Sequence, residues 1–256
     1  MAQGSPIVRL AGVQKRFAGT VALAGVDLDV GAREFVTLLG PSGCGKSTVL
    51  RLIAGLTEPT GGSIEWDDAM PQAASHRRIG FVFQEPTLMP WATVRDNVRL
   101  PLRLLRSPAA QADAAVGDAL ALVGLSDFAD VYPRELSGGM RMRVSIARAL
   151  VTQPQLLLMD EPFAALDEIS RARLNDELLA LWQRRQLTVV FVTHSVYEAV
   201  YLSTRIAVMS PRPGRIVEQL AIDAPQPRGD AFRTSDRYAA QCVQASRALR
   251  VAFADG

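Results

Sequence analysis

The sequence predicts an α/β fold built on a mainly parallel sheet with helices on both faces. In the second half of the chain, continuous apolar runs of strand length alternate with longer runs whose apolar residues recur at helical spacing. Near the N-terminus, a glycine-rich run at 40–48 lies between a β-prone stretch and a helical one. The 256 residues, 48% of them hydrophobic, are enough to bury a substantial core.

Short β-prone runs separated by turns make up the first third of the chain. Gly31 and the pair at 61–62 supply turns between these runs. Residues 48–54 carry apolar side chains at helical spacing, which predicts a helix directly after the glycine-rich run. The strands expected in this part are residues 7–13, 26–30, 34–39, 63–66 and 79–83.

The middle of the chain changes from strands to helices. Residues 95–130 are rich in alanine and predict helices, with Pro101 and Pro108 as breakers. They interrupt the alternation of strands and helices, which indicates a helical insertion into the α/β core. The alternation resumes after Tyr132, and beyond Asp223 the chain ends in a helical run rich in Arg and Ala. The elements expected after the insertion are helices at 141–151, 168–183 and 196–202 and strands at 155–159, 188–192 and 205–209.

The composition excludes several classes of protein. No apolar run approaches the ~18 residues that a membrane span needs, and the N-terminal residues lack the basic and apolar segments of a signal peptide. The two cysteines, Cys44 and Cys242, do not support a disulfide framework or a zinc site. With 28 basic and 26 acidic residues, the overall charge does not indicate a nucleic-acid partner.

The glycine-rich run matches the phosphate-binding loop: a glycine, four free positions and then Gly-Lys-Ser. Its glycines let backbone N–H groups turn toward phosphate oxygens, and the helix that follows directs its positive end at the same anion. Lys46 is expected to neutralise the β- and γ-phosphates, and the Ser47 hydroxyl to bind Mg²⁺. A chance glycine-rich turn is the alternative. The loop comprises Gly40, Pro41, Ser42, Gly43, Cys44, Gly45, Lys46, Ser47 and Thr48.

Two carboxylates follow a buried apolar run at 156–159. In enzymes with a phosphate-binding loop, an acidic residue at the end of a core strand holds the Mg²⁺ shell, which is the role expected of Asp160. Glu161 points to the other side of the strand end and suits a carboxylate that polarises water for attack on the γ-phosphate. The alternative is a solvated Asp-Glu pair at the end of a strand.

A second glycine-rich helix start lies at 136–140. Ser137 is a favoured helix cap, and by itself it indicates an ordinary N-terminus. With Gly138 and Gly139, however, it makes a second phosphate-binding element in the same chain. One nucleotide cannot readily use both elements from one subunit. A two-fold dimer would resolve this, because each chain would offer its Ser-Gly-Gly to the γ-phosphate of the other.

In order and spacing, these motifs resemble those of the ATP-binding subunits of ABC transporters. The resemblance covers residues 5–220 and implies a P-loop NTPase core of the RecA-like type with an N-terminal antiparallel β subdomain. It implies an inserted α-helical subdomain at about 85–150 and leaves residues 221–256 as a C-terminal helical tail. Met140 replaces the Gln usual in the family's signature sequence. Met142 also replaces a common Gln, and we expect it to adjust contacts at the dimer or membrane interface.

The resemblance also implies roles for single residues. Phe17 is similar to the aromatic residue that stacks on adenine, and Gln84 to the residue that touches Mg²⁺ and the attacking water and senses the membrane partner. Asp167 resembles the loop residue that crosses the dimer interface, and His194 the switch histidine at the γ-phosphate. The alternatives are a core or strand-edge phenylalanine, an exposed loop glutamine and a hydrogen-bonded histidine without a part in catalysis.

What the resemblance implies for function is hydrolysis of ATP, with Mg²⁺, at the two sites of a homodimer. The energy would drive solute uptake through separate integral membrane permease subunits, supplied by a solute-binding protein. The chain would then sit peripherally on the cytoplasmic face of the inner membrane. Leu88, Met89 and Trp91 are candidate permease contacts, or else they pack within the insertion. The match is closest to importers of the nitrate, sulfonate and taurine type, and related subunits serve bicarbonate, cyanate or pyrimidine precursors. The segments that suggest this branch are residues 84–91, 136–140, 163–167 and 209–215.

Two other functions compete with transport. A soluble ABC-type ATPase acting on nucleic acid or ribosomes usually has two ATPase domains, a long coiled coil or zinc cysteines, and the sequence shows none of these. A regulatory subunit that binds ATP without hydrolysing it would be expected to lack Glu161 or His194, and both are present. The Arg-rich tail has no chemistry that the sequence reveals, and a solvated helix face is the default.

Overall fold

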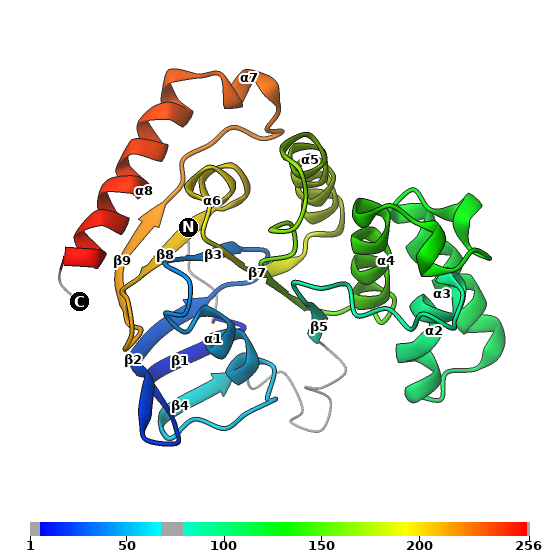
Figure 1. The fold of residues 1–256 in the computed structure, drawn as a ribbon, viewed down its shortest axis with the longest axis horizontal. Coiled ribbons are helices and arrows are strands. Elements are labelled where there is room, and N and C mark those ends of the chain that lie inside the picture. Colours follow the sequence, from blue (N-terminus) through cyan, green and yellow to red (C-terminus); the bar gives the residue numbers. More distant parts are fainter. Residues whose placement is uncertain (1–5, 68–78, 255–256) are drawn as a thin grey trace.

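A six-stranded sheet forms the centre of the computed structural model, which describes residues 6–67 and 79–254 (Figure 1). The strand order is β5-β6-β7-β3-β8-β9. Neighbours are parallel from β5 to β8, and only β9 runs antiparallel to its neighbour. The strands are β3 (Phe35–Leu39), β5 (Ile79–Val82), β6 (Leu156–Asp160), β7 (Thr188–Thr193), β8 (Arg205–Met209) and β9 (Ile216–Ala221).

Both faces of this sheet are covered. Every residue of β3, β6 and β7 is buried, and successive residues belong to different packed clusters. In β6, for example, Leu158 packs in the cluster around α1 (Lys46–Ile53), whereas Leu157 packs in the cluster around α5 (Glu168–Arg185). A strand buried on both faces reads as a continuous apolar run. The predicted α/β fold with a mainly parallel sheet is therefore confirmed.

A second sheet of three antiparallel strands lies beside the first, in the order β2-β1-β4 (Figure 1). Its strands are β1 (Val8–Phe17), β2 (Thr20–Val30) and β4 (Gly61–Trp66). Val8, Val26 and Val30 pack in the same cluster as Val49 and Leu50 of α1. The two sheets thus share one apolar core, with α1 between them.

The helical section forms a lobe of its own at the side of β5 (Figure 1). It contains α2 (Val94–Leu104), α3 (Ala109–Leu122) and α4 (Gly138–Leu150), with short 3₁₀ turns at Ser126–Phe128 and Pro133–Glu135 between α3 and α4. The three long helices pack on one another around a separate buried cluster. This lobe has the character of the insertion expected at about 85–150.

Pro101 lies inside α2 and does not end it, so that part of the prediction is wrong. An internal proline removes one helix hydrogen bond and costs ~3 kcal/mol. Val94, Val98 and Leu102 of α2 are buried in the core of the helical section, and this burial offsets the cost. Pro108 does separate two helices, because it is the N-cap residue of α3.

The C-terminal part of the chain returns to the central sheet. Helix α6 (Val196–Leu202) and the long α8 (Asp236–Ala254) pack over β8 and β9, with the short α7 (Asp230–Arg233) before α8 (Figure 1). The sequence analysis missed β9, because four of its six residues are exposed and it carries no run of buried side chains. Within the described ranges, no helix is long and apolar enough to span a bilayer.

Candidate nucleotide site

The phosphate-binding loop connects the end of β3 to the start of α1, as its sequence requires. Gly43 and Gly45 have φ angles of +77° and +108°, which L side chains rarely adopt. Gly45 is also tightly packed, because a Cβ atom there would lie 2.6 Å from Leu23 Cδ2 and 3.2 Å from the Ala22 carbonyl oxygen. Glycine at position 45 therefore lets the loop pass close beneath β2.

Lys46, the first residue of α1, is only 3% exposed. Its ammonium group donates hydrogen bonds to the carbonyl oxygens of Gly40 and Pro41, both at 2.8 Å. The same Nζ lies 3.6 Å from Glu161 Oε1. A buried cation is thus held in the middle of the loop, with the carboxylate of Glu161 facing it from the neighbouring part of the sheet.

Asp160 is the last residue of β6, and its carboxylate accepts a 2.8 Å hydrogen bond from the Ser47 hydroxyl. Burial raises the pKa of Asp160, while the hydrogen bond from Ser47 works in the opposite direction. Two hard oxygen ligands therefore lie side by side. This pair suits Mg²⁺, which is usually held by one or two protein oxygens together with phosphates and water. Among the described residues, no group of three or more His, Cys, Asp and Glu side chains could hold a metal by itself.

Glu161 links the loop to the end of β7. Its φ is +44°, and its N–H donates to the Val192 carbonyl oxygen at 3.1 Å. A non-glycine residue in this region is strained by about 1 kcal/mol or more. The bend turns the carboxylate away from the strand, so that Oε2 lies 3.0 Å from His194 Nδ1 while Oε1 faces Lys46. One carboxylate thus bridges a lysine and a histidine that lie 148 residues apart in sequence (194 − 46).

His194 follows directly after β7, and its side chain is 55% exposed. The segment behind it is well fixed. Thr193 Oγ1 accepts a hydrogen bond from the Ser195 N–H at 3.0 Å and donates to Glu198 Oε2 at 2.5 Å. Burial raises the pKa of Glu198, and the hydrogen bond from Thr193 opposes that rise. The ring of His194 therefore projects toward solvent from a backbone that is anchored on its inner side.

Gln84 and Phe17 lie at the margins of this arrangement. Gln84 is exposed and lies two residues beyond the end of β5, the strand that pairs in parallel with β6. Phe17 ends β1 and is 47% exposed, with Lys15 Nζ 4.9 Å from its ring centroid. In the described part of the chain, no hydrogen bond or ion pair joins either residue to the phosphate-binding loop.

The second glycine-rich element lies apart from the first. Ser137 caps α4 in the helical section, where its Oγ accepts from the Met140 N–H at 3.2 Å. Asp167 caps α5 in the same way, and the hydrogen bonds from Ser170 lower the pKa of its carboxyl group. Gly138 lies near the loop before α5, since a Cβ atom there would be 3.5 Å from Leu166 Cδ2. One chain therefore brings Lys46, Asp160, Glu161 and His194 together, but it leaves Ser137, Gly138, Gly139 and Asp167 outside that group.

The structure adds one contact that the sequence analysis did not foresee. Arg212, in the turn between β8 and β9, donates from Nη2 to the Gly43 carbonyl oxygen at 3.0 Å and from Nε at 3.3 Å. Gly214 of the same turn packs so closely that a Cβ atom would lie 2.1 Å from the Cys44 carbonyl oxygen. Nothing in the local sequence indicated that this turn supports the phosphate-binding loop.

Met142 does not lie where it was expected. It is buried, and it packs in the cluster that α4 shares with α5 and the central sheet. The expectation that it adjusts contacts at an interface is therefore wrong. Position 142 falls on the inner face of α4, where an apolar side chain is favoured by burial.

Known proteins are similar to this chain in both sequence and fold. The family model for ABC transporters matches residues 23–164. The chain belongs to this family. An aliphatic sulfonates import ATP-binding protein of Pseudomonas savastanoi pv. phaseolicola is 46% identical over 215 residues, which are 84% of this chain and 85% of that one. A taurine import ATP-binding protein of Rhizobium johnstonii is 47% identical over 210 residues, 81% of this chain and 79% of that one.

A solved structure agrees with the family assignment. A dimeric ATP-binding cassette in a post-hydrolysis state, bound to ADP and Pi, superposes with a TM-score of 0.72. It is 32% identical in sequence, and the match covers 85% of this chain and all of that one. The resemblance to ABC transporter ATPases is thereby confirmed, and this chain is an ABC-family ATPase that binds ATP.

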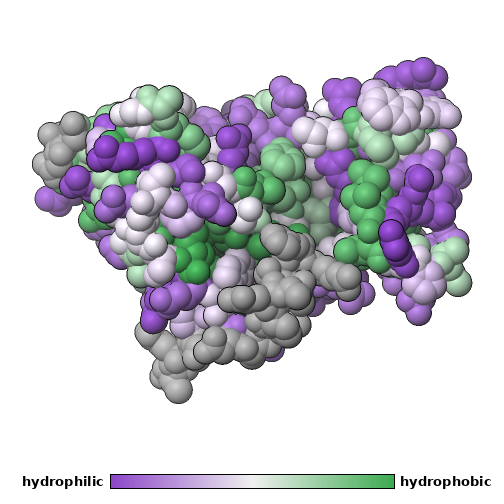
Figure 2. All heavy atoms as spheres, turned by 90° about the horizontal axis from the view of Figure 1, so that it is seen from below, coloured by the Kyte–Doolittle hydropathy of each residue, from purple (hydrophilic) through white to green (hydrophobic). Residues whose placement is uncertain are grey.

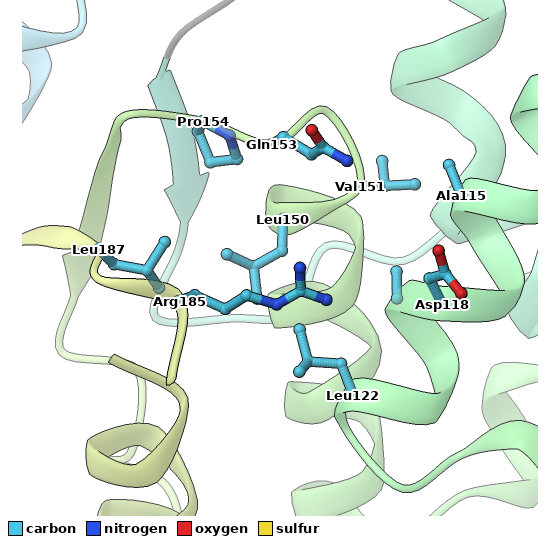
Figure 3. Close-up of a pocket in the computed structure, with 10 residues that line it drawn as sticks. Ala115, Asp118, Leu122, Leu150, Val151, Gln153, Pro154, Arg185 and Leu187 are labelled. Atoms are coloured by element: carbon cyan, nitrogen blue, oxygen red, sulfur yellow. The ribbon is translucent and has the colours of Figure 1, made fainter. Parts of the chain in front are cut away.

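Two hollows lie between the helical section of this ABC ATPase and its core. One, of about 430 Å³, is bordered by β5, α2 and α4, including Phe81, Leu104 and Arg148. On the face shown in Figure 2, apolar side chains gather along the boundary between the two parts. The other hollow, of about 290 Å³, lies between α3, the end of α4 and the end of α5. Figure 3 shows Arg185 and Asp118 on opposite walls of this second hollow.

The three residues expected to contact a permease differ in exposure. Trp91 is 77% exposed, whereas Leu88 and Met89 are half-buried. Leu88 packs against the core of the helical section, as the alternative reading of this segment expected. The segment is fixed by Asn97, whose side chain accepts from the Met89 N–H at 2.7 Å and donates back to the Met89 carbonyl oxygen. Trp91 is thus a large apolar side chain displayed on an anchored turn.

Proposed function

We propose that this chain is the ATP-hydrolysing subunit of an importer for a small solute, with Glu161 as the residue that polarises the attacking water. The observation that carries this proposal is the bridge made by Glu161, which faces the ammonium of Lys46 at 3.6 Å and the imidazole of His194 at 3.0 Å. Hydrolysis of a phosphoanhydride requires a positioned nucleophile and neutralised charge. In this proposal Lys46 neutralises phosphate charge and Glu161 positions a water molecule, both at one edge of the sheet.

In this proposal each residue has a separate task. The backbone of residues 40–48 and Lys46 hold the β- and γ-phosphates, and Phe17 stacks on the adenine ring. Ser47 and Asp160, with Gln84, hold Mg²⁺, which supplies neutralisation of phosphate charge. His194 contacts the γ-phosphoryl group, and its hydrogen bond to Glu161 keeps that carboxylate in place. The 3.0 Å separation of the histidine and the carboxylate supports this pairing.

We propose that a homodimer completes the site. Ser137, Gly138, Gly139 and Asp167 lie outside the group around Glu161 within one chain, although Ser137 is an exposed cap at the N-terminus of a 13-residue helix. The start of such a helix favours an anion. In a two-fold dimer each chain can present this element to the γ-phosphate held by its partner. ATP would then favour the closed dimer, and hydrolysis would release it.

A permease is the partner that makes use of this cycle. The chain would dock through the hollow between β5 and α2 and through Trp91, whose exposed indole lies seven residues beyond Gln84. A large exposed aromatic side chain is a typical anchor of a protein interface. The chain would therefore lie peripherally on the cytoplasmic face of the inner membrane, in an assembly that a solute-binding protein supplies.

The names of two relatives support a proposal for the substrate class. Two import ATP-binding proteins at 46% and 47% identity serve aliphatic sulfonates and taurine, according to their names. We propose a sulfonate, taurine or a compound of the nitrate, bicarbonate, cyanate or pyrimidine-precursor type. An ABC-type ATPase acting on nucleic acid or ribosomes has no supporting feature in the described residues.

Affinity capture from gently solubilised membranes tests the transport part of the proposal. The wild-type chain is expected to recover an integral membrane permease, and Trp91→Ala is expected to recover at least ~10-fold less, because a buried anchor is worth about 1.4 kcal/mol or more. Val243→Ala is the matched control, since Val243 is 65% exposed and lies in α8, which packs over β8 and β9 at the other end of the sheet from β5. Recovery of ribosomal or DNA-bound proteins without a permease would contradict the proposal.

A further inference from the structure

The tail of the chain contains a buried arginine whose purpose the proposed function does not explain. Arg228 lies between β9 and α7 and is only 8% exposed. Burial lowers the pKa of Arg228 to about 10, so its guanidinium still carries a full charge at neutral pH. A buried charge is retained only where partners satisfy it. The partners of Arg228 are therefore informative.

Arg228 caps the C-terminal end of α6. Nη1 donates to the Tyr201 carbonyl oxygen at 2.5 Å and to the Val200 carbonyl oxygen at 3.5 Å, and Nη2 donates to the Ser203 carbonyl oxygen at 2.8 Å. The last carbonyl groups of a helix have no partner within the helix, and a cation is favoured at that end. The planar guanidinium covers several of these groups at once, which an ammonium cannot do in the same geometry.

A second arginine ties the same tail to α5. Arg233 donates from Nη2 to the Ala172 carbonyl oxygen and from Nη1 to Asp176 Oδ2, both at 3.1 Å. Its guanidinium also stacks 3.9 Å from the ring centroid of Tyr201, whose hydroxyl donates to Asp176 Oδ1 at 2.5 Å. The tail, α5 and α6 are thereby held as one unit around Tyr201.

The other end of α6 carries the residue on which the proposed chemistry depends. Ser195 caps α6 by accepting from the Glu198 N–H at 3.3 Å, and His194 immediately precedes that cap. The helix has only seven residues and is therefore ~10 Å long. A short helix fixed at both ends moves as a rigid piece. A shift at Arg228 would therefore move His194 relative to Glu161.

We propose that Arg228 is a positioning residue for hydrolysis: by capping α6, it keeps His194 in contact with the carboxylate of Glu161. This inference rests on the proposed roles of Glu161 and His194. It gives the C-terminal tail a task in the reaction, although the tail lies on the far side of α6 from the site. A misplacement of ~1 Å at a catalytic group can lower the rate ~100-fold.

The test compares the kcat and KM of ATP hydrolysis in a set of variants of the full chain. Arg228→Ala is expected to lower kcat by ~10- to 100-fold and to leave KM for ATP within ~2-fold, because Lys46 and the loop are untouched. Arg228→Lys keeps the positive charge but loses the planar guanidinium that reaches several carbonyl groups, and it is expected to retain part of the kcat that Arg228→Ala loses. Arg237→Ala is the matched control, since Arg237 is half-exposed and pairs with Asp223 in the same tail. It is expected to behave as wild type.

A double-mutant cycle separates positioning from a general loss of stability. If Arg228 acts through His194, Arg228→Ala is expected to lower kcat much less in a His194→Ala background than in wild type. If Arg228→Ala lowers kcat by the same factor in both backgrounds, the inference is overturned. Val116→Ala, in the core of the helical section, supplies a destabilised variant that leaves α6 intact, and its kcat is expected to stay near wild type below its melting temperature.

Nuclear magnetic resonance of the imidazole gives a second readout that does not need turnover. The chain has two histidines, and His76→Gln leaves His194 as the only imidazole signal. Arg228→Ala is expected to shift the ring resonances of His194, and Arg237→Ala is not. Unshifted resonances would overturn the inference. If His194→Ala alone hydrolyses ATP at the wild-type rate, the proposed role of His194 fails instead, and the two failures are thus distinguishable.

Discussion

Gly45→Ala perturbs the phosphate-binding loop at the point where its geometry is most restrictive. An added Cβ atom would lie 2.6 Å from Leu23 Cδ2, and the backbone φ of +108° is strained for any L side chain. Strain of this kind costs about 1–3 kcal/mol, and overpacking a filled site costs about the same again. We therefore expect the free energy of unfolding to fall by about 2–6 kcal/mol.

Thermal unfolding and ATP titration measure this effect. For a chain of this size a loss of ~2 kcal/mol lowers Tm by at least ~4 °C, and ATP binding is expected to be lost because the loop must move away from Leu23. Gly117→Ala is the matched control. A Cβ atom at this position in α3 meets nothing within 4 Å, so alanine is expected to stabilise the chain by ~1 kcal/mol. A Gly45→Ala chain with wild-type Tm and ATP affinity would refute the packing argument.

Two further predictions concern the same edge of the sheet. Burial raises the pKa of Asp160, so its ionised form costs stability at neutral pH, and that cost disappears as pH falls through the raised pKa. Asp160→Asn is therefore expected to raise the Tm of the nucleotide-free chain and to abolish the extra stabilisation by ATP with Mg²⁺. Equal Mg²⁺-dependent shifts in both chains would count against a metal role for Asp160. Arg212→Ala is expected to weaken ATP binding ~5-fold, about 1 kcal/mol, through the lost support of Gly43. Unchanged affinity in a titration would show that the loop keeps its shape without Arg212.

The parts of the fold that could be predicted are those in which neighbouring residues form one clear pattern, such as an unbroken apolar run. β3, β6 and β7 are buried on both faces, so each one reads as an unbroken apolar run. β9 was not predicted, because an exposed edge strand lacks such a run. Its pairing with β8 nevertheless makes it a strand. Pro101 was misjudged because local propensity yields to packing when a helix face is buried elsewhere in the fold.

The candidate site also has a part that could be predicted from the sequence and a part that could not. Residues 40–48 and Asp160 and Glu161 could be found because their chemistry depends on local spacing beside a strand end. Arg212 and Arg228 could not, because each acts on carbonyl groups of a segment that is distant in sequence. Met142 was assigned to an interface because its place in the signature helix was known but the face on which it lies was not. Three-dimensional contacts between loops and helix ends carry no periodic signal along the chain.

The central claim is that Glu161 activates water within an ATP-bound dimer, and one variant tests it most directly. Glu161→Gln keeps the size of the side chain but removes its charge. With Mg²⁺ and ATP it is expected to run as a stable dimer in size-exclusion chromatography while hydrolysing ATP at least ~100-fold more slowly than wild type. Glu218→Gln, an exposed substitution in β9, is expected to match wild type in both respects. Hydrolysis by Glu161→Gln at the wild-type rate would contradict the account.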